Sequence, residues 1–365
     1  MDPIPPEDLG VPIVHPDRNT RVHMKYPEAD HANDLHRHLT RRFGDTAPRT
    51  ALSVDGAGVH WHCTAERGDS FCSIACFAVR GPQYYTSFER GSQKLATGRT
   101  SSREDTLAAV DDWLQGREVS FLHDRFRFVD QTKRALSGIG DTVIARVPQL
   151  QQSATCELQH AIADIYYLWF RTGDRSCQIS YHRNNEFTNA AFHWDECELF
   201  SFRVDNNEQL TDILKRWLCD RAMPSTMRTE FPWLSIGDLA DYYEKGDPVE
   251  GEFIKSWDWM QQFYEDDSFP MKTAVLTLIA QLRNAGYDRK LRAGQSLWSL
   301  IVSRSRRHGL REDQPCVHFW FREGVMDVRV FVRDRHEAEE IRGATIALSA
   351  SVEAALRQLA EQPVD

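Results

Sequence analysis

Histidine and cysteine residues gather in one short stretch of the chain, at His60, His62, Cys63, Cys72 and Cys76. Imidazole nitrogen and thiolate sulfur are ligands that Zn²⁺ prefers, so this stretch is the first place to look for a metal site. Its alternating apolar residues predict a β-hairpin, in which successive side chains point to opposite faces. The two histidines then point away from the three cysteines. We therefore interpret the cysteines as core residues and expect no metal and no cofactor, with zinc as the minor alternative.

The sequence contains none of the short motifs that mark common catalytic or nucleotide-binding sites. It has no GxxxxGK[ST] or GxGxxG phosphate loop, no HExxH metal-binding helix and no GxSxG nucleophile turn. Serines, histidines and acids are plentiful, but no spacing places a nucleophile beside a base. This favours a non-enzymatic protein, and an enzyme whose residues converge from distant strands is the alternative.

Basic residues concentrate in one segment, residues 283–311. It holds eight Lys or Arg residues and one acid, Asp288, which is a net charge of +7, whereas the rest of the chain holds 36 basic and 53 acidic residues, a net charge of −17. Arginine side chains suit phosphate and carboxylate groups, and tryptophans can stack on bases. We predict an anion-binding site with these residues: Arg304, Arg306, Arg307, His308, Arg311, Trp298 and Trp320.

Acidic and aromatic residues alternate in residues 230–270. This segment carries Asp or Glu at eleven positions and only two basic residues, Lys245 and Lys255. Such a connector suits a basic partner protein. The alternative is that its acids pair with the arginines of residues 283–311 inside the same molecule.

An internal repeat organises the chain. The dipeptide Gly-Asp at Gly68 returns at Gly173, 105 residues later, and Trp113-Leu114 returns at Trp217, 104 residues later. A third, shortened copy surrounds Gly324. Self-similarity at a fixed spacing predicts repeated structural units.

Each copy predicts a four-stranded antiparallel sheet followed by a helix. Two-residue turns are predicted at Arg67-Gly68, Thr172-Gly173 and Glu323-Gly324. The hairpins that follow pair Cys63 with Cys72, Leu168 with Cys177 and Phe319 with Val328. Capping boxes that begin at Ser101 and Asp205 predict where the first two helices start. The fold class that follows is α+β: tandem ββββα units, two full copies and one shortened copy, joined by helical connectors.

These patterns divide the chain into four parts. We expect an N-terminal arm and a helix over 27–43 in residues 1–48. Residues 49–150 should form the first unit with a helical connector. Residues 151–270 should form the second unit with the acidic aromatic connector, and residues 271–365 should form a helix and the third unit. In the third unit the strand over 297–302 is followed by a basic insertion, 303–311, and insertions in repeats usually map to a binding face.

Composition is that of a folded protein. The hydrophobic fraction is 41%, charged residues make up 27%, and the net charge is −10. No apolar run is long enough to cross a bilayer, and residues 1–26 do not resemble a signal peptide, so we expect a cytoplasmic protein without membrane partners. The eight scattered cysteines indicate reduced thiols rather than a disulfide framework.

The function that these features favour is non-enzymatic binding of another macromolecule. We expect a protein partner, bound through the acidic connector or the basic loop, in the manner of a bacterial immunity, antitoxin or defence protein. One alternative is nucleic-acid or nucleotide binding through the phosphate-binding residues of 283–311. The other is an enzyme with a site between repeats. The sequence does not predict the oligomeric state.

Overall fold

A computed structural model gives the fold of this 365-residue chain. It describes residues 27–43, 49–55, 58–77, 81–161, 165–182, 187–266, 269, 271–306, 313–331 and 338–364. The chain divides into two compact units. The first comprises Met1–Ala135 with His160–Ile165, and the second comprises Leu136–Gln159 with Tyr166–Asp365.

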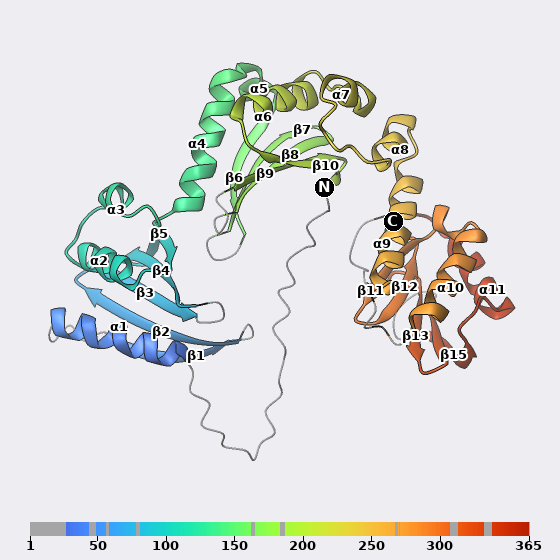
Figure 1. The fold of residues 1–365 in the computed structure, drawn as a ribbon, viewed down its shortest axis with the longest axis horizontal. Coiled ribbons are helices and arrows are strands. Elements are labelled where there is room, and N and C mark those ends of the chain that lie inside the picture. Colours follow the sequence, from blue (N-terminus) through green and yellow to red (C-terminus); the bar gives the residue numbers. More distant parts are fainter. Residues whose placement is uncertain are drawn as a thin grey trace, which may run out of the picture. The chain divides into compact units, whose positions relative to one another are not determined.

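The fold is mixed α+β, and the strands of the described residues form three antiparallel sheets (Figure 1). Neighbours in each sheet are neighbours in the chain, so every sheet is a meander. The first sheet holds β1 (Arg49–Asp55), β2 (Gly58–Arg67), β3 (Ser70–Phe77), β4 (Gln83–Arg90) and β5 (Gln93–Thr100). The second holds β6 (Thr155–His160), β7 (Tyr166–Thr172), β8 (Arg175–His182), β9 (Phe187–Trp194) and β10 (Cys197–Val204). The third holds β11 (Arg292–Ser296), β12 (Ser299–Ser303), β13 (Cys316–Arg322), β14 (Val325–Phe331) and β15 (Ala338–Thr345).

Helices precede, follow and connect the sheets. The predicted helix over 27–43 is confirmed as α1 (Pro27–Phe43). The others are α2 (Arg103–Leu114), α3 (Val119–Arg125), α4 (Gln131–Arg146), α5 (Pro148–Ser153), α6 (Asn207–Leu214) with a π-helical turn (Lys215–Cys219), α7 (Pro224–Glu230), α8 (Leu239–Lys245), α9 (Pro248–Tyr264), α10 (Lys272–Asn284), a 3-10 turn (Tyr287–Arg289) and α11 (Ala350–Ala360). None of the described helices has both the length and the apolar character needed to span a bilayer.

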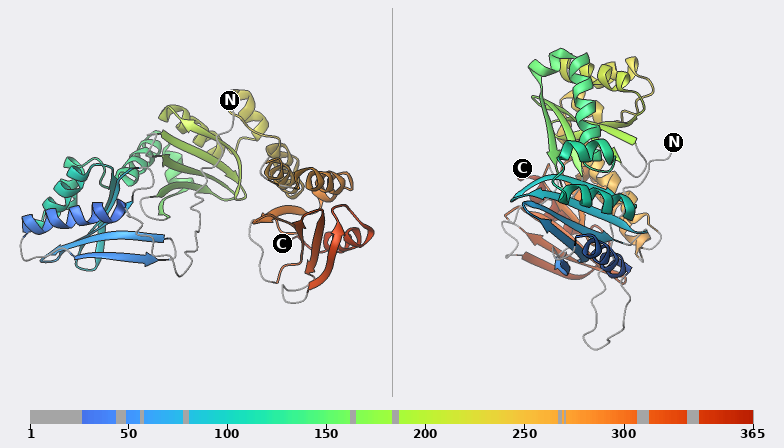
Figure 2. Two further views of the ribbon diagram at one scale, coloured as in Figure 1. Left: turned by 60° about the horizontal axis from the view of Figure 1, so that its bottom comes forward. Right: turned by 90° about the vertical axis from the view of Figure 1, so that its left-hand side faces the viewer.

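In the first unit, α1 and α2 pack on one face of the sheet (Figure 2). Leu39 of α1 and Val110 of α2 join Phe88 of the sheet in one buried cluster. The indole of Trp113 lies in the same cluster and donates its N–H to the backbone oxygen of Phe71 at 2.9 Å. The apolar stripe of α2 therefore faces the sheet, as the helical spacing of its apolar residues predicts.

The predicted register of the first hairpin is wrong by two residues. Cys63 pairs with Ile74, not with Cys72. The turn is Gly68-Asp69, because Gly68 adopts a left-handed φ of +63° at its first position, where glycine carries no steric cost. A shift of two residues keeps every side chain on its face, so Cys63 and Cys72 are still buried as predicted.

The second hairpin differs from its prediction in the same way. Leu168 pairs with Ile179, not with Cys177, and Gly173 has a φ of +58° at the first turn position. The three apolar residues share the core face of the sheet, which packs on α4, α6 and the connector helices.

The third hairpin has the predicted register, with Phe319 opposite Val328. Its sheet begins earlier than predicted, however, because β11 precedes β12 and the residues between them, Leu297 and Trp298, form a turn rather than the start of a strand. Each sheet therefore has five strands, where the prediction was four. One strand follows the hairpin at Gly324 before α11, whereas two strands follow the hairpins of the first two sheets before α2 and α6.

Two predicted helix starts are one residue too early. Ser102, not Ser101, accepts the backbone N–H of Asp105 (3.1 Å) at the start of α2. Asn206, not Asp205, caps α6. An N-cap residue must keep an extended backbone while its side chain turns back toward the helix, and both observed residues do so.

The cysteines are thiols. All eight lie among the described residues and all are free, with Cys63, Cys72 and Cys76 inside the core of the first unit. Burial raises the pKa of the Cys72 and Cys177 thiols, which keeps them protonated. Within the described part of the chain no three His, Cys, Asp or Glu residues are placed to hold a metal ion. The side chain of His60 lies outside the described residues.

Candidate functional site

The structure describes four of the seven residues predicted as an anion-binding site: Trp298, Arg304, Arg306 and Trp320. Arg307, His308 and Arg311 lie outside the described ranges. Trp298 directly precedes β12 and Arg304 directly follows it, so six residue steps, about 20 Å at about 3.3 Å per residue, separate their Cα atoms.

Trp320 is engaged within its own sheet. Its ring lies 4.9 Å from that of His318, and the guanidinium of Arg329 lies 4.8 Å from its centre. Arg304 donates from Nη1 to the backbone oxygen of Lys290 at 2.9 Å. Both side chains support local structure in the third sheet.

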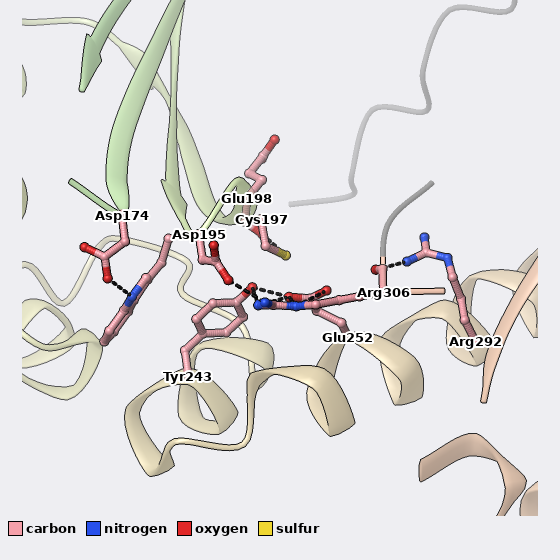
Figure 3. Close-up of polar contacts among 9 residues, drawn as sticks. Asp174, Asp195, Cys197, Glu198, Tyr243, Glu252, Arg292 and Arg306 are labelled. Atoms are coloured by element: carbon pink, nitrogen blue, oxygen red, sulfur yellow. Dashed lines mark hydrogen bonds and ion pairs between the residues drawn. The ribbon is translucent and has the colours of Figure 1, made fainter. Parts of the chain in front are cut away.

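Arg306 lies in a polar cluster that sequence reasoning did not predict (Figure 3). Its Nε donates to both carboxylate oxygens of Glu252 (3.1 and 3.3 Å), and Nη2 donates to Oε1 at 2.9 Å. The Glu252 side chain is 5% exposed and that of Arg306 is 21% exposed. Burial opposes the charged guanidinium, but the hydrogen bonds and charge of Glu252 outweigh it and raise the pKa of Arg306. Arg306 is thus a fixed cation whose Nε–Nη2 edge is held by one buried acid.

Tyr243 completes the buried side of the cluster. Its hydroxyl donates to Glu252 and accepts from Nη2 of Arg306 at 3.4 Å. Burial, followed by the hydrogen bond to Glu252, raises the pKa of the phenol well above its usual range. Tyr243 is therefore a neutral donor, and it neutralises none of the charge of Arg306.

Asp195 closes the exposed side of the cluster. Its carboxylate lies 2.5 Å from Nη1 of Arg306, and its side chain is 46% exposed. Asp195 and Glu196 form the turn between β9 and β10, and both adopt left-handed φ angles, +50° and +65°. We call Asp195, Tyr243, Glu252 and Arg306 the Arg306 cluster.

The base of this turn is held by a second set of contacts. The Trp194 indole donates to the Asp174 carboxylate at 2.8 Å, and the backbone N–H of Asp195 donates to the backbone oxygen of Asp174. Arg175 lies between the rings of Trp194 and Trp217, 4.2 Å from the centre of each. Burial, with a contribution from the charge of a neighbouring arginine, lowers the pKa of Arg175 to about 10.

Two helices bring Tyr243 and Glu252 together. α8 carries Tyr243 and α9 carries Glu252, and the helices meet where Gly251 lies against Tyr242. A Cβ at Gly251 would lie 2.5 Å from Cβ of Tyr242, so this approach requires glycine. The Ser256 hydroxyl in turn accepts the backbone N–H of Ala293 at 2.9 Å, which fixes β11 on α9.

Other arginines of residues 283–311 also pair with acids of residues 230–270. Arg283 contacts Asp258 at 2.9 Å, and Arg289 contacts Glu250 at 3.0 Å. With Arg306 and Glu252, these are three ion pairs between the basic segment and the acidic connector. The alternative that the sequence left open, pairing inside the molecule, is what the structure shows for these three arginines.

The hairpin before β12 presents an apolar tip. Leu297 is 86% exposed and adopts a left-handed φ of +53°, and Trp298 is 55% exposed. The ring of Trp298 stacks on Phe269 with a centroid distance of 5.6 Å, and its backbone oxygen accepts from the Tyr264 hydroxyl at 3.3 Å. Trp298 is therefore anchored at its ring and its backbone, while Leu297 faces solvent.

Helix α9 extends this apolar area. Phe263 contacts the Trp298 ring at 5.8 Å, and Trp259, which precedes it by four residues on the same helix face, is 60% exposed. We call Trp259, Phe263, Leu297 and Trp298 the Trp298 surface. It contains three of the most exposed large apolar side chains among the described residues.

The two sites differ in what they offer to a ligand. The Arg306 cluster uses its charges internally and holds no nucleophile beside a base among its four residues. The Trp298 surface offers apolar and aromatic groups, with Leu297 86% exposed. Comparison with protein-family models, with curated proteins and with solved structures finds no match to this chain, so the site alone carries the functional argument.

Sequence reasoning singled out Arg306 and Trp298 but missed their neighbours. Asp195 and Tyr243 belong to the second repeat and its connector, more than sixty residues before Arg306 in the chain. The dipeptide Leu297-Trp298 stands between polar residues, Gln295-Ser296 and Ser299. That pattern, polar-apolar-apolar-polar at a chain reversal, is the signal that would have identified the tip.

Proposed function

We propose that this chain is a non-enzymatic interaction protein that binds another protein through the Trp298 surface. The observation that carries the proposal is the 86% exposure of Leu297 at the tip of the hairpin that Trp298 anchors. A leucine in the left-handed region costs folding free energy, and an exposed one gains nothing from burial. Binding of a partner would repay this cost.

The composition of the surface supports a protein partner. Tryptophan is enriched at the positions that dominate binding energy, and such positions cluster in the middle of interfaces. Trp298 is already ordered by Phe269 and Phe263, so binding would cost little side-chain entropy. The surface lies partly on α9 of the acidic connector, which agrees with the expected role of that connector in binding.

Charge supports the choice of a protein over a nucleic acid. Arg283, Arg289 and Arg306 are committed to acids of the same chain, and the chain has a net charge of −10. A partner with an apolar pocket in a basic surface fits these features. We keep a bacterial, cytoplasmic immunity or antitoxin protein as the specific form of this proposal.

We also propose that the three sheets are copies of one unit. Strands β3 and β8 correspond at an offset of 105 residues, and strands β4 and β5 correspond to β9 and β10 at 104. The same backbone hydrogen bond supports the equivalence: Gly91 donates to Asp69 in the first sheet, and Asp195 donates to Asp174 in the second. The third sheet fits as a copy that gains β11 and lacks one strand before its helix.

Site-directed photo-crosslinking tests the proposed interface. A benzophenone side chain at Leu297 should crosslink to one polypeptide in cells of the native host, while the same group at Val364, which is 38% exposed, should not. The partner is then purified and titrated against the wild type and the Trp259→Ala and Trp298→Ala variants. We expect each variant to weaken binding at least about thirtyfold, as for a residue that contributes about 2 kcal/mol.

Three results would overturn the proposal. The first is equal crosslinking from Leu297 and Val364, and the second is a purified partner that binds wild type and variants equally. The third is a crosslinked product that contains nucleic acid rather than polypeptide, which would favour the alternative of nucleic-acid binding.

A further inference from the structure

One end of the third sheet carries both a protruding leucine and a hollow. Neighbouring strands of this sheet run in opposite directions, so the turn that holds Leu297, the turn at Gly324 and the end of β15 at Thr345 lie at the same end. We propose that the Trp298 surface docks on a second copy of this chain, with Leu297 of each copy in the hollow of the other. This inference rests on the proposed use of that surface in protein binding, and it names the partner.

The hollow lies between the start of α10 and the ends of β14 and β15, and we call it the α10 hollow. Its apolar wall includes Met271, Ala274 and Ile346, and its polar lining includes Lys272 and Thr273. Its volume is about 390 Å³, which falls within the range of pockets that enclose small ligands. A leucine side chain therefore fits inside it and meets apolar groups there.

Aromatic rings connect Leu297 to the α10 hollow. The ring of Trp298 stacks on Phe269, and the ring of Phe269 lies 6.4 Å from that of Phe321. The backbone N–H of Lys272 donates to the backbone oxygen of Phe269 at 3.2 Å, so the lining of the hollow begins directly after this ring. Two to three strand spacings separate the leucine from the hollow, about 10–14 Å. A two-fold axis midway between them passes close to these aromatic rings.

The arrangement is self-complementary, which selects a second copy as the partner. Around a two-fold axis, residue i of one copy contacts residue j of the other, and j contacts i. Because Leu297 and the α10 hollow lie side by side on one surface, such an axis fills both hollows and covers both leucines in a closed dimer. A head-to-tail contact would leave one leucine and one hollow exposed at the ends of the assembly.

Charge beside Leu297 is opposite to charge beside the hollow. Glu265 is exposed at the C-terminal end of α9, next to Phe263, where the helix dipole is also negative. Lys272 lines the hollow in the first turn of α10, where the helix dipole is positive, and the cap residue Met271 makes no side-chain hydrogen bond. Two-fold pairing brings the acidic end of α9 in one copy opposite the basic start of α10 in the other.

Sedimentation equilibrium of the purified full chain tests the dimer. We expect monomers and dimers and no larger species, since the interface closes on itself. Leu297→Ala withdraws two leucines from two hollows, so we expect it to weaken the dimer at least about thirtyfold. Thr273→Trp changes an exposed residue of the lining and blocks the hollow, and it should weaken the dimer as much. Ala280→Trp is the matched control, because Ala280 is exposed on the same helix outside the hollow.

A mixture of the two weakened variants gives the sharpest measurement. Leu297→Ala keeps its hollow and Thr273→Trp keeps its leucine, so the mixed dimer contains one complete contact that neither variant forms alone. We expect the mixed dimer to be at least about fivefold tighter than either variant dimer. A variant that had failed to fold would give no such rescue.

Three results would overturn this inference: a wild type that stays monomeric at about 100 µM, species that grow beyond the dimer, and a mixture no tighter than its components. The proposed function is judged separately by the benzophenone at Leu297. Crosslinking of a monomeric chain to a different polypeptide would refute the dimer and keep the proposed function. Equal crosslinking from Leu297 and Val364, together with a monomeric chain, would refute both.

Discussion

The guanidinium of Arg306 and the carboxylate of Glu252 share three hydrogen bonds, and the acid is almost completely buried. This contact joins the basic segment 283–311 to the acidic connector 230–270, the two most strongly charged parts of the sequence. The positive charge of Arg306, which the sequence suggested for binding a partner, is thus paired with an acid of the same chain. Large apolar side chains, by contrast, stay exposed at Leu297 and Trp259.

Removing one member of this pair should cost more than removing both. Arg306→Met leaves the carboxylate of Glu252 buried without its cation, and we expect the free energy of unfolding to fall by about 3–5 kcal/mol. The double variant Glu252→Met with Arg306→Met leaves no unpaired buried charge, since the Asp195 carboxylate, which loses its contact with Arg306, is 46% exposed. We expect it to recover most of that loss. Urea denaturation of both variants and the wild type measures the difference. A double variant that is less stable than Arg306→Met would contradict this account.

The close approach of α8 and α9 should not tolerate a methyl group. Gly251→Ala would place a Cβ 2.5 Å from Tyr242, and we expect a loss of about 1–3 kcal/mol because the helices must separate. Gly138→Ala in α4 is the matched control, since no atom lies within 4 Å of its Cβ position. That change should stabilise by about 0.5–1 kcal/mol through helix propensity. Thermal unfolding of the two variants tests whether Gly251→Ala is destabilised and Gly138→Ala is stabilised.

Replacing Leu297 at the hairpin tip should remove partner binding without lowering the stability of the fold. Leu297→Gly relieves the left-handed strain, and we expect it to raise stability by about 0.5–1 kcal/mol after the greater entropy of unfolded glycine is counted. Leu297→Ala keeps the strain and should leave stability nearly unchanged. Both variants lack the exposed side chain, so both should lose binding of the crosslinked partner. Retained binding in either one would argue against the tip as the contact.

Tyr243 should make stability fall at alkaline pH. Its folded pKa is raised above the unfolded value of about 10, so the neutral form is favoured in the folded protein. The contribution of neutral Tyr243 to the free energy of unfolding is therefore complete below about pH 10. It is lost as the pH rises toward the folded pKa. Tyr243→Phe should be less stable than wild type by a constant amount below about pH 9, because it lacks the hydrogen bond to Glu252. Above pH 10 the gap should narrow, and a gap that widens in denaturation at about pH 11 would refute the assignment.

Local sequence signals predicted individual elements well. The helix that begins at Pro27 was bounded correctly, and the hairpin at Gly324 had the correct register. The hairpins at Gly68 and Gly173 were placed correctly, but their register was two residues off, because the turn takes glycine at its first position. The same faces were buried in either register, since side chains alternate with a period of two.

The contacts between distant segments could not be predicted. Asp195 and Arg306 are more than one hundred residues apart, and no local rule links a turn in one sheet to a segment after a strand in another. The extra strand β11 was missed because its five residues, Arg292 to Ser296, carry neither apolar alternation nor β-branched side chains. Its place in the sheet depends on the backbone of β12 and on Ser256 of α9.

The sequence by itself determined that this chain has a mixed α+β fold with antiparallel sheets, because the alternation of apolar residues and the glycines at the turns act over a few neighbouring residues. Only the tertiary structure decided which charges are neutralised and which apolar groups stay exposed. Arg306 and Trp298 looked like parts of one site in the sequence. In the folded chain Arg306 is 21% exposed and paired with the buried Glu252, whereas Trp298 is 55% exposed, because burial depends on how separate elements pack and not on residue type.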